Sequence, residues 1–172
     1  IAPLFHIGAL AATLPVLYMG AKVVLQAQFD PAGALKVVED EGVTNLFLVP
    51  AMWQALSMVP DFDKYDLSTL RFLTSGGSPC PIPVIEFFQQ RGLRFFEGFG
   101  MTETTAGACI LGNEDAVRKH GSVGKPLIHM QMRIVDENDQ DVRPGETGEL
   151  VVRGPNVFSE YWNKPEATAE AF

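Results

Sequence analysis

Between residues 21 and 99, short runs rich in β-branched and aromatic residues alternate with segments whose apolar residues recur at helical spacing. The runs that predict strands are 21–26, 44–49, 70–75 and 93–99. Strands that are separated by helices are joined by crossover connections, which run right-handed between parallel strands. The first part of the chain therefore predicts an α/β fold, with a parallel sheet layered with helices.

Residues typical of helix ends lie between these runs. Asp30 is the expected N-cap of a helix that has Pro31 at its first position and ends at Gly42. Pro50 and Pro81 are expected to begin two further helices, because proline fits the first turn of a helix without loss of a hydrogen bond.

The chain opens with a long apolar stretch at residues 3–20. This stretch contains Pro3, His6 and Pro15, lacks a basic leader, and falls short of a clean membrane-spanning run. We expect a buried helix here rather than a membrane segment.

After about residue 112 the pattern changes to alternating apolar and polar residues that are interrupted by turn residues. Strands are expected at 130–136 and 148–153, joined through the turn sequences ENDQD and RPGETG. The chain is therefore divided into an α/β subdomain, residues 1–112, and part of an antiparallel β-rich subdomain, residues 113–172, which resembles a distorted barrel.

The composition excludes several classes of protein. The chain has 47% hydrophobic and 20% charged residues, which is typical of a globular protein. A net charge of −8 argues against a nucleic-acid partner. The two cysteines, Cys80 and Cys109, form no CxxC pair, which disfavours a zinc site and a disulfide framework. We expect a cytoplasmic protein, with peripheral membrane contact left open.

The two ends of the sequence indicate a piece of a longer protein. Ile1 is not an initiator methionine, and residues 164–172 (KPEATAEAF) begin a helix at the very end of the sequence.

Two glycine-rich stretches, 74–79 and 97–103, each follow a predicted strand directly. If their strands are neighbours, the stretches lie side by side at the carboxyl edge of the sheet, where ligands bind in such folds. Phe99 offers a ring for stacking, Thr102 a hydroxyl for a phosphate and Glu103 a carboxylate for magnesium. This combination predicts a nucleoside triphosphate site.

Each of these features also has an ordinary structural explanation. Residues 76–79 (GGSP) are typical of a tight turn, and neither stretch completes a phosphate loop or a GxGxxG dinucleotide motif. His6 in an apolar segment is more often packed than catalytic. Thr102 and Glu103 could begin a helix, and Gly124 could be an ordinary loop glycine.

Five segments, taken together and in order, resemble the acyl-adenylate-forming superfamily, which includes acyl-CoA synthetases, firefly luciferase and the adenylation domains of peptide synthetases. These segments are PLFHIGAL, TSGGSPCP, EGFGMTETT, GSVGKP and GETGELVVRGPNVFSEYWNKPEAT. The match covers essentially the whole chain, is strongest to the fatty-acyl-CoA ligase branch, and implies an internal fragment of the large N-terminal domain.

The resemblance implies a nucleotide-binding role for two groups of residues. Those expected to line the adenine and the start of the acyl tunnel are Gly76, Gly77, Ser78 and Pro79. Gly98 and Phe99 are expected to follow the adenine ring, and Phe99 stands where the family commonly has tyrosine. Loss of that hydroxyl leaves the stacking face intact.

The resemblance also implies catalytic and substrate-binding roles. Thr102 is expected to donate to phosphate oxygens and Glu103 to hold Mg²⁺. His6 is expected at the entrance of the acyl pocket, with Gly100 and Gly124 in its walls. The small residues at 105–108 imply a roomy pocket, which favours an extended alkyl chain.

The implied reaction joins ATP and a carboxylic acid, here a fatty acid, into an acyl-AMP, from which coenzyme A displaces AMP. Three family parts are missing from the sequence: a phosphate-clamping loop with its lysine, a ribose-binding aspartate and a C-terminal lid with a catalytic lysine. The isolated chain is therefore expected to be inactive. Two alternatives remain: a non-catalytic module that binds nucleotide or acyl groups, and a peptide-synthetase adenylation domain.

Overall fold

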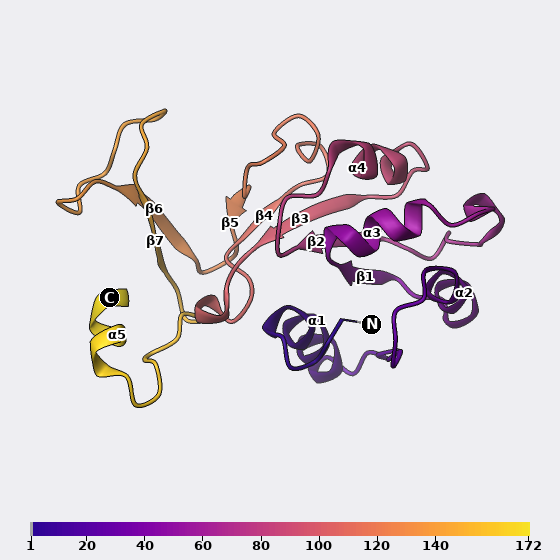
Figure 1. Ribbon diagram of the computed structural model, residues 1–172, viewed down its shortest axis with the longest axis horizontal. Helices are drawn as coiled ribbons and strands as arrows, with labels where there is room; N and C mark the ends of the chain where they lie inside the picture. Colours follow the sequence, from indigo (N-terminus) through magenta and orange to yellow (C-terminus); the bar gives the residue numbers. More distant parts are fainter. Residues whose placement is uncertain (1) are drawn as a thin grey trace.

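The computed structural model describes residues 2–172, and a five-stranded mixed sheet forms its centre (Figure 1). The strands lie in the order β1 to β5, and the first three are parallel while β4 and β5 run antiparallel to their neighbours. Their bounds are β1 (Asn45–Leu48), β2 (Phe72–Gly76), β3 (Phe95–Phe99), β4 (Cys109–Leu111) and β5 (Lys125–Pro126). The predicted α/β class is confirmed, and three of the four predicted parallel strands are present.

Three helices connect or flank the parallel strands at the predicted places. They are α2 (Pro31–Glu41), α3 (Pro50–Ser57) and α4 (Ile82–Gln89). Asp30 Oδ2 accepts a hydrogen bond of 2.7 Å from the Gly33 N–H, as expected of an N-cap. Gly42 ends α2 in the left-handed conformation, with φ of 60°.

The main core lies between the sheet and the pair α3 and α4, which cover one of its faces (Figure 1). Trp53 of α3 packs edge-to-face against Phe88 of α4 and Phe95 of β3, at centroid distances of 5.1 and 5.3 Å. All three aromatic side chains are buried. This packing fixes the positions of β2 and β3, whose ends carry the glycine-rich stretches.

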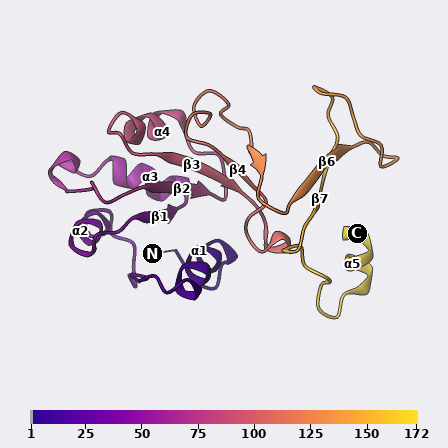
Figure 2. The ribbon, with the colours of Figure 1, turned by 180° about the vertical axis from the view of Figure 1, so that it is seen from behind.

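The apolar opening forms α1 (Ile7–Tyr18), but the prediction that this helix is buried is wrong. Within the described residues, only Ala9 of this helix is buried, and Tyr18 and the preceding Phe5 are more than 90% exposed. The helix lies on the face of the sheet opposite α3 and α4 (Figures 1 and 2). Gly8 faces the sheet, because a Cβ atom there would lie 3.3 Å from the Phe47 ring, so one side of the helix is covered and the rest faces outward. No helix in residues 2–172 combines the length and apolarity needed to cross a bilayer.

The strand predicted at residues 21–26 is also wrong, because this segment has no regular secondary structure. β-Branched residues favour strands only where a neighbouring strand and a packing surface exist. Here β1 is the edge of the sheet, and the segment pairs with no strand. It connects α1 to α2 instead.

The last part of the chain forms a separate two-stranded antiparallel sheet followed by a short helix (Figure 1). Strands β6 (Gln131–Val135) and β7 (Glu149–Arg153) match the predicted hairpin, and α5 (Pro165–Ala171) follows. The five-stranded sheet continues to Pro126, beyond the change of pattern at residue 112. The division into 1–112 and 113–172 stays a prediction.

Candidate functional site

The two glycine-rich stretches lie side by side at the carboxyl ends of β2 and β3. These strands are parallel neighbours, with Ser75 opposite Glu97 and Gly76 opposite Gly98. The crossover through α4 carries the chain from one strand to the next, so both strands end at the same edge of the sheet. The predicted juxtaposition is therefore present.

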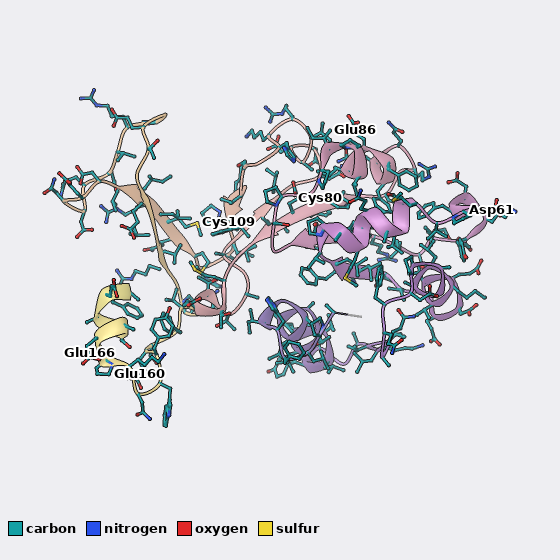
Figure 3. All side chains as sticks on the ribbon, in the orientation of Figure 1. Asp61, Cys80, Glu86, Cys109, Glu160 and Glu166 are labelled. Carbon is teal, nitrogen blue, oxygen red and sulfur yellow. The ribbon has the colours of Figure 1, made fainter. Side chains whose placement is uncertain are left out.

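The loop after β2 is fixed by a carboxylate that the sequence reasoning had not assigned. Glu97 Oε1 accepts a hydrogen bond of 2.7 Å from the Cys80 N–H, and the Glu97 side chain is buried. On the other side, His120 Nε2 lies 2.9 Å from the Cys80 carbonyl oxygen. These contacts hold Cys80 beside the sheet (Figure 3) and leave residues 77–79 exposed.

The glycines at the strand ends keep the sheet surface flat. A Cβ atom on Gly76 would lie 3.1 Å from the Phe47 ring and 3.3 Å from the Gly98 carbonyl oxygen. A Cβ atom on Gly98 would meet nothing closer than 3.7 Å. Gly76 is therefore needed for packing, whereas Gly98 leaves backbone accessible to a flat ligand. Phe99, the next residue, is half-buried.

Residues 100–106 form a tight loop around the short 3₁₀ helix η2 (Thr102–Thr104). Thr104, not Thr102 or Glu103, closes its first turn: the buried Thr104 Oγ1 accepts from the Met101 N–H at 3.1 Å. The short helix η2 does begin at Thr102, but its N-cap is Met101, which is bonded to Thr104, so neither Thr102 nor Glu103 caps it. Thr102 is exposed and Glu103 is half-buried, so both side chains are available at the rim of the site.

The small residues that follow pack within the loop itself. A Cβ atom on Gly100 would lie 1.3 Å from the Ala106 carbonyl oxygen, and one on Gly107 would lie 2.8 Å from Leu127 Cδ1. Ala108 is fully buried. Gly107 and Ala108 thus allow close packing here, and a role of residues 105–108 in the wall of an acyl pocket stays a prediction.

Glu103 is held by the segment that follows β7. Its carboxylate Oε1 accepts a hydrogen bond of 2.6 Å from the Tyr161 hydroxyl, and its carbonyl oxygen accepts one of 2.8 Å from the Phe158 N–H. The Tyr161 hydrogen bond is the main cause that lowers the pKa of Glu103, and the same bond raises the pKa of Tyr161. Glu103 is therefore ionised at neutral pH.

The chemistry of this carboxylate fits magnesium. Mg²⁺ commonly binds one or two carboxylates, with water and phosphate oxygens as its other ligands. An ionised, half-buried Glu103 at the loop rim meets that requirement. Across residues 2–172 there is no group of three or more His, Cys, Asp or Glu side chains that could form a cage for a metal ion.

Asn156 ties the same loop to the segment after β7. Its Nδ2 donates to the carbonyl oxygens of Thr104 at 2.6 Å and Gly107 at 2.8 Å, and its own carbonyl accepts from Thr105 Oγ1 at 2.7 Å. Asn156 and Tyr161 lie some fifty residues beyond the loop in sequence. No local sequence motif indicates that either residue contacts this loop.

His6 and Gly124 belong to other elements than the two loops. His6 is exposed at the N-cap of α1, where its Nδ1 accepts from the Gly8 N–H at 3.3 Å. Gly124 precedes β5, and a Cβ atom there would lie 2.1 Å from the Ile110 carbonyl oxygen of β4. Strand β4 separates it from β3. The structure thus groups residues 76–79 and 98–103 at one edge, and the acyl-pocket roles of His6 and Gly124 stay a prediction.

Paired glycine loops, a hydroxyl and an ionised carboxylate at the carboxyl edge of parallel strands are typical of nucleotide-binding α/β proteins. A family model described as AMP-binding enzyme matches residues 1–162. The chain therefore belongs to the AMP-binding enzyme family.

Named relatives agree with this membership. Feruloyl-CoA synthase from Amycolatopsis sp is 45% identical over 170 residues, which are 98% of this chain and 35% of that protein. Among solved structures, the Mycobacterium tuberculosis fatty acyl CoA synthetase has a TM-score of 0.92 at 30% identity, covering 99% of this chain and 34% of that one. The Bacillus subtilis O-succinylbenzoate coenzyme A synthetase (MenE), solved with ATP and magnesium ion, has a TM-score of 0.88 at 32% identity, covering 99% and 35%. The chain spans about a third of the length of these proteins.

Proposed function

We propose that the full-length natural protein containing this chain is an AMP-forming acyl-CoA synthetase, an acid–thiol ligase. Its substrates are a carboxylic acid, ATP and coenzyme A. The observation that carries this proposal is the pairing of Gly76 with Gly98, which brings the two glycine loops to one edge of the sheet, with Thr102 and Glu103 following in the second loop. The likeness to a synthetase solved with ATP and magnesium ion supports it.

Each loop has a role in this proposal. Residues 76–79 and the backbone of Gly98 provide a flat surface for adenine, and the half-buried Phe99 ring packs beside it. The exposed Thr102 hydroxyl donates to a phosphate oxygen, and Glu103 binds the metal through its ionised carboxylate. When bound, Mg²⁺ neutralises negative charge on the departing pyrophosphate. His6, Gly100 and Gly124 remain the proposed acyl-side residues, with Gly100 needed first for the loop turn.

Two classes of acid are candidates for the substrate. A fatty acid follows from the motifs PLFH, FGMTE and EYWNKPEAT and from the fold shared with a fatty acyl CoA synthetase. An aromatic acid is favoured by the 45% identity to a feruloyl-CoA synthase. The close packing of Gly107 against Leu127 gives a structural reason for a small residue there that is independent of the substrate.

The 172-residue chain by itself is proposed to be inactive, because it spans about a third of its relatives. Transition-state stabilisation requires all donors around the phosphates to be placed together. The phosphate-clamping loop and the lysine-bearing lid expected from the family are proposed to come from other parts of the same polypeptide.

ATP–pyrophosphate exchange by the full-length protein, measured with a panel of fatty and aromatic acids, tests this function. We expect exchange with at least one acid, and acyl-CoA formation when coenzyme A is added. Nucleotide binding without exchange would favour the non-catalytic module. Exchange followed by transfer to a carrier protein, with no acyl-CoA, would favour a peptide-synthetase adenylation domain.

A further inference from the structure

Tyr161 lies 58 residues beyond Glu103 in the sequence, yet its hydroxyl reaches the Glu103 carboxylate. We propose that Tyr161 is a positioning residue, which holds Glu103 in the orientation that the magnesium ion of the ATP complex requires. This inference rests on the proposed function, because it gives Tyr161 its role through the proposed metal ligand.

The hydrogen bond itself is short and charge-assisted. Tyr161 Oη donates to Glu103 Oε1 at 2.6 Å, within the range of hydroxyl donors to a carboxylate. A carboxylate has two oxygens and about four acceptor positions, so it can accept this bond and still bind a cation. The bond therefore restrains the carboxylate without removing its capacity to bind metal.

Tyr161 is itself fixed before any ligand binds. Its backbone N–H donates to Thr168 Oγ1 at 3.0 Å, and its carbonyl oxygen accepts from the Lys164 N–H at 3.1 Å. Its ring packs edge-to-face on Phe158, at 4.6 Å between centroids. Glu160, the residue before Tyr161, marks this segment near α5 in Figure 3. The phenol is thus held in place from several sides and can serve as a fixed donor.

The same segment restrains the backbone of Glu103. Phe158 N–H donates to the Glu103 carbonyl oxygen, and Asn156 bonds the carbonyls of Thr104 and Gly107. Backbone and side chain of Glu103 are therefore fixed from one segment. Without the Tyr161 hydroxyl, the glutamate side chain regains rotamer freedom that must be lost again when metal binds. Partners that orient a metal ligand commonly change metal affinity by about 10- to 100-fold.

This role predicts a difference between two nucleotides. The complex of ATP with Mg²⁺ uses the carboxylate, whereas AMP in the absence of Mg²⁺ does not need it. A purely structural role for Tyr161 would weaken both complexes equally.

The test compares Tyr161→Phe with wild type in the full-length protein by isothermal titration calorimetry. Tyr18→Phe is the matched control, because it removes a phenol that is 91% exposed at the end of α1. For Tyr161→Phe we expect an affinity for ATP with Mg²⁺ that is about 10-fold weaker, and an affinity for AMP within about 2-fold of wild type. Tyr18→Phe should change neither affinity.

A double-mutant cycle with Glu103→Gln keeps the test decisive if Tyr161→Phe also lowers stability. If Tyr161 acts through Glu103, adding Tyr161→Phe to Glu103→Gln leaves the affinity for ATP with Mg²⁺ unchanged. Equal losses for AMP and for ATP with Mg²⁺, or a full loss in the Glu103→Gln background, would overturn the positioning role. Failure of the wild-type protein to bind ATP with Mg²⁺ would instead overturn the proposed function, and the inference with it.

Discussion

At the scale of single residues, glycine serves two different purposes in the loop after β3 (Phe95–Phe99). Gly100 is required by sterics, because a Cβ atom would lie 1.3 Å from the Ala106 carbonyl oxygen. Gly98 has no neighbour that a Cβ atom would meet closer than 3.7 Å. The first glycine is therefore needed by the loop, and we propose that the second is needed by the ligand.

These two glycines give a matched pair of variants. Gly100→Ala is expected to destabilise the protein by about 3 kcal/mol or more, because the loop backbone must move. Gly98→Ala is expected to keep the melting temperature of wild type and to weaken AMP binding by occupying the adenine surface. Calorimetry of the full-length variants measures both effects. A stable Gly100→Ala variant, or a Gly98→Ala variant with wild-type AMP affinity, would contradict this distinction.

Cys80 gives a prediction for pH dependence. Burial raises the pKa of its thiol to about 11, above the value of 9.0 for an exposed thiol. The raised folded-state pKa means that its contribution to stability is complete below pH 9 and falls as the pH rises from 9 to about 11. Iodoacetamide should label Cys80 slowly at pH 8 in the native protein and rapidly in urea, as measured by peptide mass spectrometry. Equal rates in the two conditions would contradict a buried, protonated thiol.

At the scale of elements, the layer of α3 (Pro50–Ser57) and α4 (Ile82–Gln89) over the sheet decides where the loops sit. Trp53 is 1% exposed and packs on both Phe88 and Phe95, whereas Trp162 is 83% exposed. Trp53→Ala should therefore cost about 3–5 kcal/mol, and Trp162→Ala should change stability by less than about 0.5 kcal/mol. Thermal unfolding of the full-length variants checks this, and similar melting temperatures for the two would be inconsistent with the described core.

At this scale, the elements that could be predicted from the sequence are those whose signals lie within the element itself. Asp30, Pro31 and Gly42 act within one helix, so α2 could be predicted from its own residues. The run 21–26 has strand-forming residues, yet its conformation depends on a neighbouring strand that is absent from this edge. β4 and β5 are three and two residues long and carry too little periodicity to be recognised.

The residues of the candidate site show the same contrast between local and long-range signals. Thr102 and Glu103 were recognisable because their chemistry lies in one short stretch. The partners Asn156 and Tyr161 were not, because hydrogen bonds between segments some fifty residues apart leave no local pattern. The apolar face of α1 was misread for a related reason: hydropathy reports what a helix can bury and not how much neighbouring surface meets it.

At the scale of the whole molecule, the chain spans about a third of its relatives' length and is proposed to supply one side of a nucleotide site. The remaining phosphate donors are proposed to come from elsewhere in the full-length protein. The central claim is that Glu103 binds the metal that assists departure of pyrophosphate, while the glycine loops bind the adenine.

ATP–pyrophosphate exchange by the full-length Glu103→Gln variant, with AMP affinity measured in parallel, tests that claim most directly. Glutamine keeps the shape of the side chain and removes its charge. The account predicts that exchange falls by about 100-fold or more, while the affinity for AMP stays within about 2-fold of wild type. Exchange at the wild-type rate in the Glu103→Gln variant would contradict it.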